Sequence, residues 1–156
     1  MPELVERIEV AAPPERVWAA LTAWTRQGEW MVATDVRTVA GPAQGVGGRL
    51  AARTGLPLPG GRHVGLLDTM VITKWDPPRL VEVQHTGRLV RGPGIFEIEG
   101  RGEHSSFVWT ERLHLPYGPL GQVGWVLVKP FALVGIRRSL KRFAAFARTF
   151  EPAAEA

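Results

Sequence analysis

Phe107–Leu115 reads FVWTERLHL, a stretch in which apolar and polar residues alternate. Its odd-numbered positions are apolar except for Glu111, and its even-numbered positions are mostly polar. Successive side chains leave a β-strand on opposite faces, so this alternation predicts a half-buried strand. The carboxylate of Glu111 then falls on the buried face, where a charge is costly unless it is paired, hydrogen-bonded or hydrated. Either this row lines a cavity, or the assignment of faces fails at Glu111.

The segments before this strand predict an antiparallel meander. Strand-like patterns occupy residues 64–75 (VGLLDTMVITKW), 79–87 (RLVEVQHTG) and 94–100 (GIFEIEG). Turn-forming segments separate them at DPP, RLVRGPG and RGEH, and strands joined by short turns run antiparallel.

Shorter strands are predicted nearer the N-terminus, at residues 3–10, 34–40 and 47–54. The next stretch, GLPLPGGRH (55–63), has the composition of a loop but carries Leu56 and Leu58. Apolar residues in a flexible loop suit a lid, so we expect this loop to be mobile and to border a pocket. An ordinary solvated hairpin loop is the alternative.

Three segments predict helices. AAPPERVWAALTAW (11–24) has a proline pair suited to a helix start, followed by apolar residues at helical spacing. A second short helix is predicted around TRQGEWM (25–31). From about Pro119 to Phe150 one long helix is predicted, with Pro130 expected to kink it. Its apolar face comprises Leu133, Ile136, Leu140, Phe143 and Ala147.

Composition predicts one globular domain over residues 1–156, with 45% hydrophobic and 22% charged residues. The absence of cysteine excludes disulfides and thiolate metal sites and fits a reducing, cytoplasmic setting. The charged N-terminal segment MPELVERIEV does not resemble a secretory signal. Arginines are scattered, with RRSLKR as the one dense group, so no nucleic-acid partner is predicted. No metal or other cofactor is expected, because no closely spaced His/Glu/Asp motif occurs.

Four motifs carry a family resemblance: APPERVWAALT (12–22), WDPPRLVEVQHTG (75–87), GPGIFEIEG (92–100) and VWTERLHLPYGPLG (108–121). Together with the order of elements, they make the chain similar to the SRPBCC or START-like helix-grip superfamily, in its bacterial polyketide cyclase/dehydrase-like branch. The resemblance implies an α+β fold in which about seven curved antiparallel strands wrap a long C-terminal helix. It also implies two short helices between strands one and two, and a hydrophobic cavity between sheet and helix. Because the superfamily has no universal catalytic motif, it assigns no catalytic residue here.

In such a fold, the inward rows of neighbouring strands line the cavity. Folding the hairpin at DPP pairs Met70 with His85, and folding the one at RGEH pairs Phe96 with Phe107. The inward set is then Asp68, Met70, Ile72, Val81, Val83, His85, Gly94, Phe96, Ile98, Phe107, Trp109, Glu111 and Leu113. Resemblance to members whose second short helix borders the pocket adds Trp30. The candidate ligand-binding residues are Trp30, Asp68, Met70, His85, Phe96, Phe107, Trp109, Glu111 and Leu133.

Asp68, His85 and Glu111 are expected at one end of the sheet, as the polar end of an apolar pocket. They form a structural ion pair, anchor a ligand or act as acid–base groups, and the sequence leaves these roles open. Glu111 is expected to be largely buried and to have a partner such as His85, Arg91 or a water molecule. The predicted function is binding of a hydrophobic small molecule, aromatic and polyketide-like or a lipid. The alternatives are a polyketide cyclase or dehydratase and a protein-interaction module.

The apolar stretch Gly121–Gly135 is too short and interrupted to predict a membrane span. A buried helix end is the simplest interpretation. A dimer face, a membrane-contacting segment and a pocket wall are the alternatives, and the oligomeric state is left open.

Overall fold

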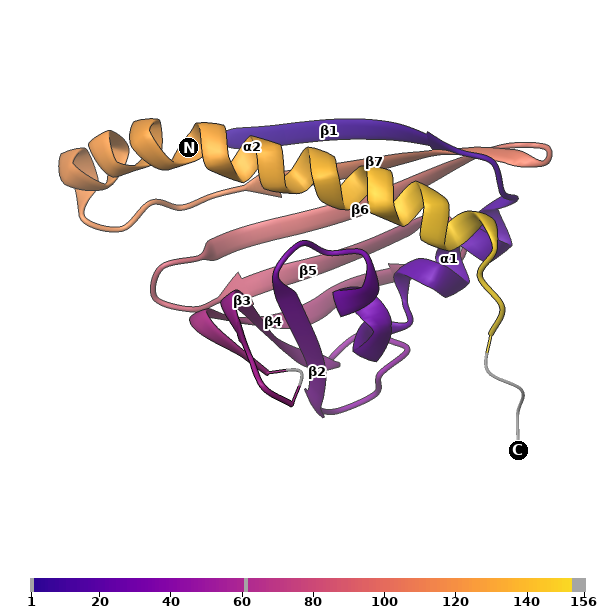
Figure 1. Cartoon of the computed structure of the whole chain (residues 1–156), viewed down its shortest axis with the longest axis horizontal. Coiled ribbons are helices and arrows are strands. Elements are labelled where there is room, and N and C mark those ends of the chain that lie inside the picture. The colour runs from indigo at the N-terminus through magenta and orange to yellow at the C-terminus, as the bar shows by residue number, and fades with distance from the viewer. Residues whose placement is uncertain (1, 61, 153–156) are drawn as a thin grey trace.

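The computed structural model describes residues 2–60 and 62–152. Strand β1 comes first, and the long helix α2 comes last (Figure 1). The elements are β1 (Glu3–Val10), α1 (Pro14–Leu21), the 3-10 helix η1 (Trp24–Glu29), β2 (Thr34–Ala40), β3 (Arg49–Leu58), β4 (Arg62–Asp76), β5 (Leu80–Thr86), β6 (Arg91–Arg101), β7 (His104–Arg112) and α2 (Gly118–Arg148).

One curved antiparallel sheet contains all seven strands, in the order β1-β7-β6-β5-β4-β3-β2. Strand β1 therefore lies at one edge and pairs with β7, so the first and last strands are neighbours. Helix α2 runs across the sheet, and α1 and η1 follow β1 (Figure 1). The predicted fold class is confirmed.

The core lies between the sheet and the C-terminal half of α2. Phe143 of α2 is fully buried, with its ring centroid 4.6 Å from that of Phe107 on β7 and 4.7 Å from that of Trp30. Leu140 and Ala147 are buried on the same helix face, as their spacing predicts. Helix α1 has a proline in its first turn, where the missing N–H costs no hydrogen bond, and buries Val17 and Leu21.

One predicted hairpin register is confirmed and the other is corrected. Met70 pairs with His85, as expected. Phe96, however, pairs with Trp109 instead of Phe107, because the β6–β7 turn is centred one residue later than that register requires, so that Arg101 pairs with His104. A shift of two residues keeps every side chain on its predicted face, so the inward rows survive this correction.

The predicted loop at 55–63 is wrong. Residues 55–58 continue β3 and residues 62–63 begin β4, while residue 61 lies outside the described residues. Gly55 and Gly65 pair directly, and a Cβ on either would meet the other strand's backbone at less than 3 Å. By composition, glycines in this segment indicate a loop. In the structure, Gly55 and Gly65 instead allow two paired strands to approach closely.

One predicted boundary also changes. Strand β7 ends at Arg112, so Leu113 and Leu115 are half-buried in the connection to α2 instead of continuing the row. The reason is that its partner β1 begins at Glu3, although the N–H of Leu113 still donates to the carbonyl of Pro2. Helix α2 runs through Pro130 as one element.

Among the described residues, α2 alone is long and apolar enough to cross a membrane by those two criteria. Its C-terminal half packs on the sheet through Leu140, Phe143 and Ala147. This packing makes α2 a core helix over that half. The apolar segment Gly121–Gly135 lies in the other half, which is not buried, so the interpretation of it as a buried helix end is wrong.

Candidate functional site

A cavity of about 370 Å³ lies between the sheet, the segment after η1 and the middle of α2. Sheet residues form its floor, and α2 residues Phe131, Gly135 and Ile136 form part of its wall. The complete lining is Trp24, Gln27, Met31, Val32, Ala33, Thr34, Val36, Ala52, Thr54, Asp68, Met70, Val83, His85, Phe96, Trp109, Glu111, Phe131, Ala132, Gly135, Ile136 and Ser139. The volume falls in the range of small-molecule sites, and the lining is mostly apolar.

Six of the candidate residues line this cavity: Asp68, Met70, His85, Phe96, Trp109 and Glu111. The other three do not. Trp30 and Phe107 have no exposed surface and pack against Phe143 in the core. Leu133 is half-buried on α2 and is not among the residues that line the cavity, although Ala132 and Gly135 are.

His85 joins two carboxylates at one end of the cavity. Its Nδ1 lies 2.8 Å from Oδ1 of Asp68, and its Nε2 lies 2.9 Å from Oε2 of Glu111. The other oxygen of Glu111 accepts a hydrogen bond of 2.8 Å from the indole Nε1 of Trp109. The side chain of His85 is 6% exposed, and the side chains of Asp68 and Glu111 are 17% and 12% exposed. The expected pairing of Glu111 with His85 is therefore confirmed.

The cluster spans a strand that contributes no side chain to it. His85 is on β5 and Glu111 is on β7, and β6 runs between them with Gly92 opposite His85 and Gly94 opposite Glu111. A Cβ on Gly94 would lie 3.0 Å from Nε2 of His85 and 3.1 Å from Oε1 of Glu111. The glycine therefore leaves the space in which imidazole and carboxylate meet.

Both ring nitrogens of His85 face carboxylate oxygens, which accept hydrogen bonds, so both nitrogens carry a proton. Burial lowers the pKa of His85, but hydrogen bonds to Asp68 and Glu111 and their negative charges outweigh it and raise the pKa to about 10. At neutral pH His85 is therefore an imidazolium held between Asp68 and Glu111.

Some hydrogen-bonding atoms of the cluster have partners among the described residues, and one does not. Both oxygens of Glu111 and both nitrogens of His85 already have partners. Within the described part of the chain, Oδ2 of Asp68 has no protein donor, and Asp68 lines the cavity. The polar end of the cavity therefore offers an acceptor.

Sequence reasoning missed the cavity residues outside the meander. Ser139 of α2 accepts a hydrogen bond of 3.0 Å from the N–H of Val32, which ties the segment after η1 to the helix beside the cavity. Thr34 and Thr54 join β2 and β3 through hydroxyls 3.0 Å apart. Only tertiary packing brings these short polar residues together, so periodicity within one element gives no signal for them.

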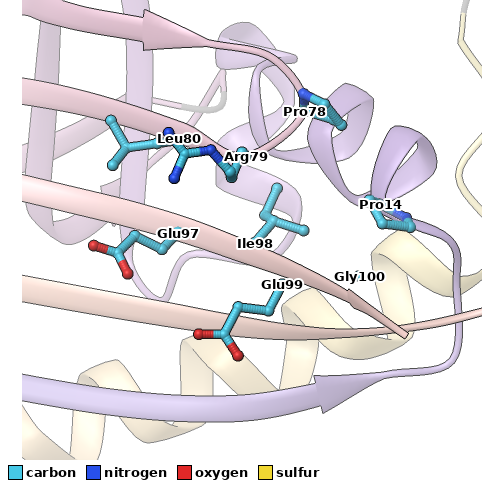
Figure 2. A pocket seen from close by; sticks show the side chains of 8 residues that line it. All are labelled: Pro14, Pro78, Arg79, Leu80, Glu97, Ile98, Glu99 and Gly100. Carbon is cyan, nitrogen blue, oxygen red and sulfur yellow. The ribbon is translucent and has the colours of Figure 1, made fainter. Parts of the chain in front are cut away.

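A second hollow, of about 380 Å³, lies where Pro14 approaches the β6 residues Glu97–Gly100 (Figure 2). Glu97 and Glu99 point to the side of β6 opposite the buried Ile98, as alternation requires (Figure 2). Glu99 and Arg79 are exposed, so this hollow lacks the buried polar cluster that distinguishes the cavity beneath α2.

The sequence model of one protein family, described as polyketide cyclase / dehydrase and lipid transport, matches residues 1–148. The chain belongs to this family. Family membership and the helix-grip fold point to binding of a hydrophobic ligand. A search of curated proteins finds no match.

Solved structures share the fold at low sequence identity. A crystal structure of TTHA0849 from Thermus thermophilus has a TM-score of 0.72 and 19% identity, covering 94% of this chain and 97% of that one. A crystal structure of CV1439 from Chromobacterium violaceum has a TM-score of 0.66 and 13% identity, covering 96% and 100%. The Aha1 dimer from Colwellia psychrerythraea has a TM-score of 0.55 and 20% identity, covering 86% and 92%. At these identities, the likeness shows the fold alone.

Proposed function

We propose that this protein binds a hydrophobic small molecule that carries a hydrogen-bond donor, such as a hydroxyl or phenol group. The observation that carries the proposal is the Asp68–His85–Glu111 cluster at one end of an otherwise apolar cavity. An apolar cavity with a few convergent polar groups is the usual form of a small-molecule site.

The preference for a donor follows from how the cluster is paired. His85 has no proton left for a ligand, because both of its ring protons are engaged by carboxylates. Oδ2 of Asp68 is the acceptor left over, and a ligand hydroxyl placed there makes a hydrogen bond to a charged group. Such bonds contribute about 1.5–3 kcal/mol.

The apolar end favours a flat or aromatic ligand body. Phe96 and Trp109 lie side by side on the floor with ring centroids 5.3 Å apart, and Phe131 stands on the helix side. Aromatic rings contribute a large apolar area and stack on other rings. This lining supports an aromatic, polyketide-like ligand over a long acyl chain.

A matched pair of probes tests the proposal. 2-Naphthol donates a hydrogen bond, whereas 2-methoxynaphthalene has nearly the same body and donates none. By isothermal titration calorimetry we expect 2-naphthol to bind roughly tenfold or more tightly, the ratio that one charge-assisted hydrogen bond provides. Equal affinities would show that the ligand needs no hydrogen-bond donor. If neither probe bound, the proposal of a cavity for aromatic ligands would be refuted.

Catalysis is the second candidate, and a specific observation favours it: two carboxylates, of Asp68 and Glu111, each lie within hydrogen-bond distance of His85 beside the cavity. In a cyclase- or dehydratase-type reaction, Asp68 is placed to accept a proton from a bound ligand, and the His85 imidazolium stabilises the adjacent negative charge. An enzyme would lose turnover in Asp68→Asn while still binding its substrate. A binding protein would lose affinity in the same variant.

A further inference from the structure

The N-terminal half of α2 exposes large apolar side chains that the fold leaves uncovered. Leu120, Val123, Leu127, Phe131 and Val134 recur every three or four residues, so they form one stripe along the helix, and each is more than half exposed. An 18-residue stretch of α2 has a mean hydropathy of 1.4, and no residue in it is fully buried. Exposed apolar surface of this extent marks a contact site on a folded protein.

Other exposed apolar residues lie at the same end of the molecule. Antiparallel pairing brings the tip of the β3–β4 hairpin, the β5–β6 loop and the start of α2 to one end of the sheet. Figure 1 shows the orange N-terminal turns of α2 reaching past this end. We call the exposed set the apolar end: Leu56, Leu58, Val64, Leu66, Leu89, Tyr117, Leu120, Val123, Val126, Leu127, Val128, Phe131 and Val134.

Most of the charges near the stripe and the β5–β6 loop are basic, and Gly118–Arg148 and Gln84–Phe96 contain no acidic residue. The cations closest to the apolar residues along the chain are Arg88, Arg91 and Lys129. Two acidic residues of β1 near α2, Glu3 and Glu6, are paired with Arg112 and Arg137. An anionic surface complements this arrangement, whereas a second copy of the chain would bring like charges together.

We propose that the apolar end docks on an anionic lipid membrane. The stripe on α2 lies in the plane of the interface, and the leucines of the hairpin and of the β5–β6 loop reach the same surface. Apolar side chains in the headgroup region together with cations near anionic lipids are the two contributions that hold a peripheral protein on a bilayer. Docking is peripheral because the C-terminal half of α2 is packed in the core.

This inference does not depend on which ligand the cavity takes. Phe131 connects the two features, because it lines the cavity and is 80% exposed on the stripe. The cavity therefore opens beside the proposed membrane contact. The variants used to test docking avoid Phe131 and every other residue of the cavity wall.

The test is co-sedimentation of the full chain with vesicles of phosphatidylcholine alone or with about a third phosphatidylserine. Val123→Gln/Leu127→Gln removes two residues of the stripe and keeps good helix formers. Val39→Gln/Val46→Gln is the matched control, because both valines are exposed at the opposite end of the sheet. Circular dichroism and 2-naphthol titration check that each variant is folded.

We expect binding to phosphatidylserine vesicles but little to phosphatidylcholine alone, and a decrease on raising the salt concentration. The Val123/Leu127 variant should lose roughly tenfold or more in vesicle affinity, and the control variant should bind like the unaltered chain. Equal binding by both variants would overturn the proposal. So would the absence of vesicle binding, including the case where the stripe variant instead abolishes a dimer seen by analytical ultracentrifugation.

Discussion

At the scale of single residues, the site depends on how one histidine is shared. His85 is 5% exposed and has a carboxylate at each ring nitrogen, so its charge is compensated where solvent is nearly absent. A buried charge persists only with such partners. The two carboxylates differ in turn. Both oxygens of Glu111 accept hydrogen bonds, from His85 and Trp109, whereas Oδ2 of Asp68, a residue of the cavity wall, has no donor among the described residues.

The protonation of His85 gives the first prediction. Because the carboxylates raise its pKa to about 10, the ring remains an imidazolium at about pH 8, well above the ordinary range for histidine. Nitrogen-15 NMR of the ring should show both nitrogens protonated at that pH. A neutral imidazole with one bare nitrogen would contradict the hydrogen-bonding scheme.

The same group predicts how stability depends on pH. The pKa of His85 rises from an ordinary 6.5 to about 10 on folding, so the stabilisation is complete below 6.5 and is lost as pH rises through 10. We expect the stability difference between the unaltered chain and His85→Gln to shrink across this window, by at most ~1.4 kcal/mol per pH unit. Urea unfolding at several pH values measures it, and a difference that grows with pH would have the wrong sign.

Glu111 and Asp68 have different partners, so we expect Glu111→Gln to affect mainly stability and Asp68→Asn to affect mainly ligand affinity. Glu111→Gln should lower the free energy of unfolding by about 1.5–3 kcal/mol, because it weakens hydrogen bonds to a charged partner. Its effect on 2-naphthol affinity should be small. Asp68→Asn should show the larger loss of affinity. Chemical denaturation and calorimetry on both variants check this, and the reverse ranking would assign the ligand to Glu111.

At the scale of elements, the site depends on the absence of a side chain at Gly94 of β6. A side chain at position 94 would enter the space between His85 and Glu111. The GPG motif at 92–94 therefore allows His85 of β5 to hydrogen-bond with Glu111 of β7 across the intervening strand β6. Here the sequence was informative for faces and poor for boundaries. Alternation in FVWTERLHL placed Phe107, Trp109 and Glu111 correctly, because burial enforces a period of two.

What the sequence left undetermined at this scale has physical causes. Residues 55–58 have loop-like composition, yet pairing with β4 makes them a strand, since cross-strand hydrogen bonds outweigh weak local preferences. Trp30 and Phe107 were expected in the cavity and lie in the core, because the contact with Phe143 depends on how α2 crosses the sheet. Periodicity within α2 predicts its buried face but not its position along the sheet.

The role of Gly94 predicts a further result. Gly94→Ala should push His85 and Glu111 apart and lower the free energy of unfolding by about 1–3 kcal/mol, the usual cost of forcing an atom into filled space. Gly45→Ala is the matched control, because a Cβ there meets Pro42 at an ordinary 3.8 Å. Thermal unfolding and the nitrogen-15 spectrum of His85 report the two effects. An unchanged ring spectrum in Gly94→Ala would show that the cluster tolerates a side chain on β6.

At the scale of the whole molecule, the core and the cavity lie toward one end of α2, and the exposed apolar stripe lies toward the other. The sheet and the C-terminal half of α2 form the core, and the cavity begins where α2 passes Ser139 toward its N-terminus. Beyond the cavity, α2 exposes the apolar stripe, so ligand site and proposed membrane contact follow one another along a single helix. Family membership made hydrophobic ligand binding the expectation. The cluster is the basis of our proposal that such a ligand presents a hydrogen-bond donor.

The most direct test of that claim combines the two probes with one variant. In the unaltered chain, calorimetry should show 2-naphthol binding roughly tenfold or more tightly than 2-methoxynaphthalene. In Asp68→Asn the preference should collapse to near unity, because the carboxylate that accepts the hydroxyl is gone, while 2-methoxynaphthalene binds as before. A preference for 2-naphthol that survives in Asp68→Asn would contradict the account.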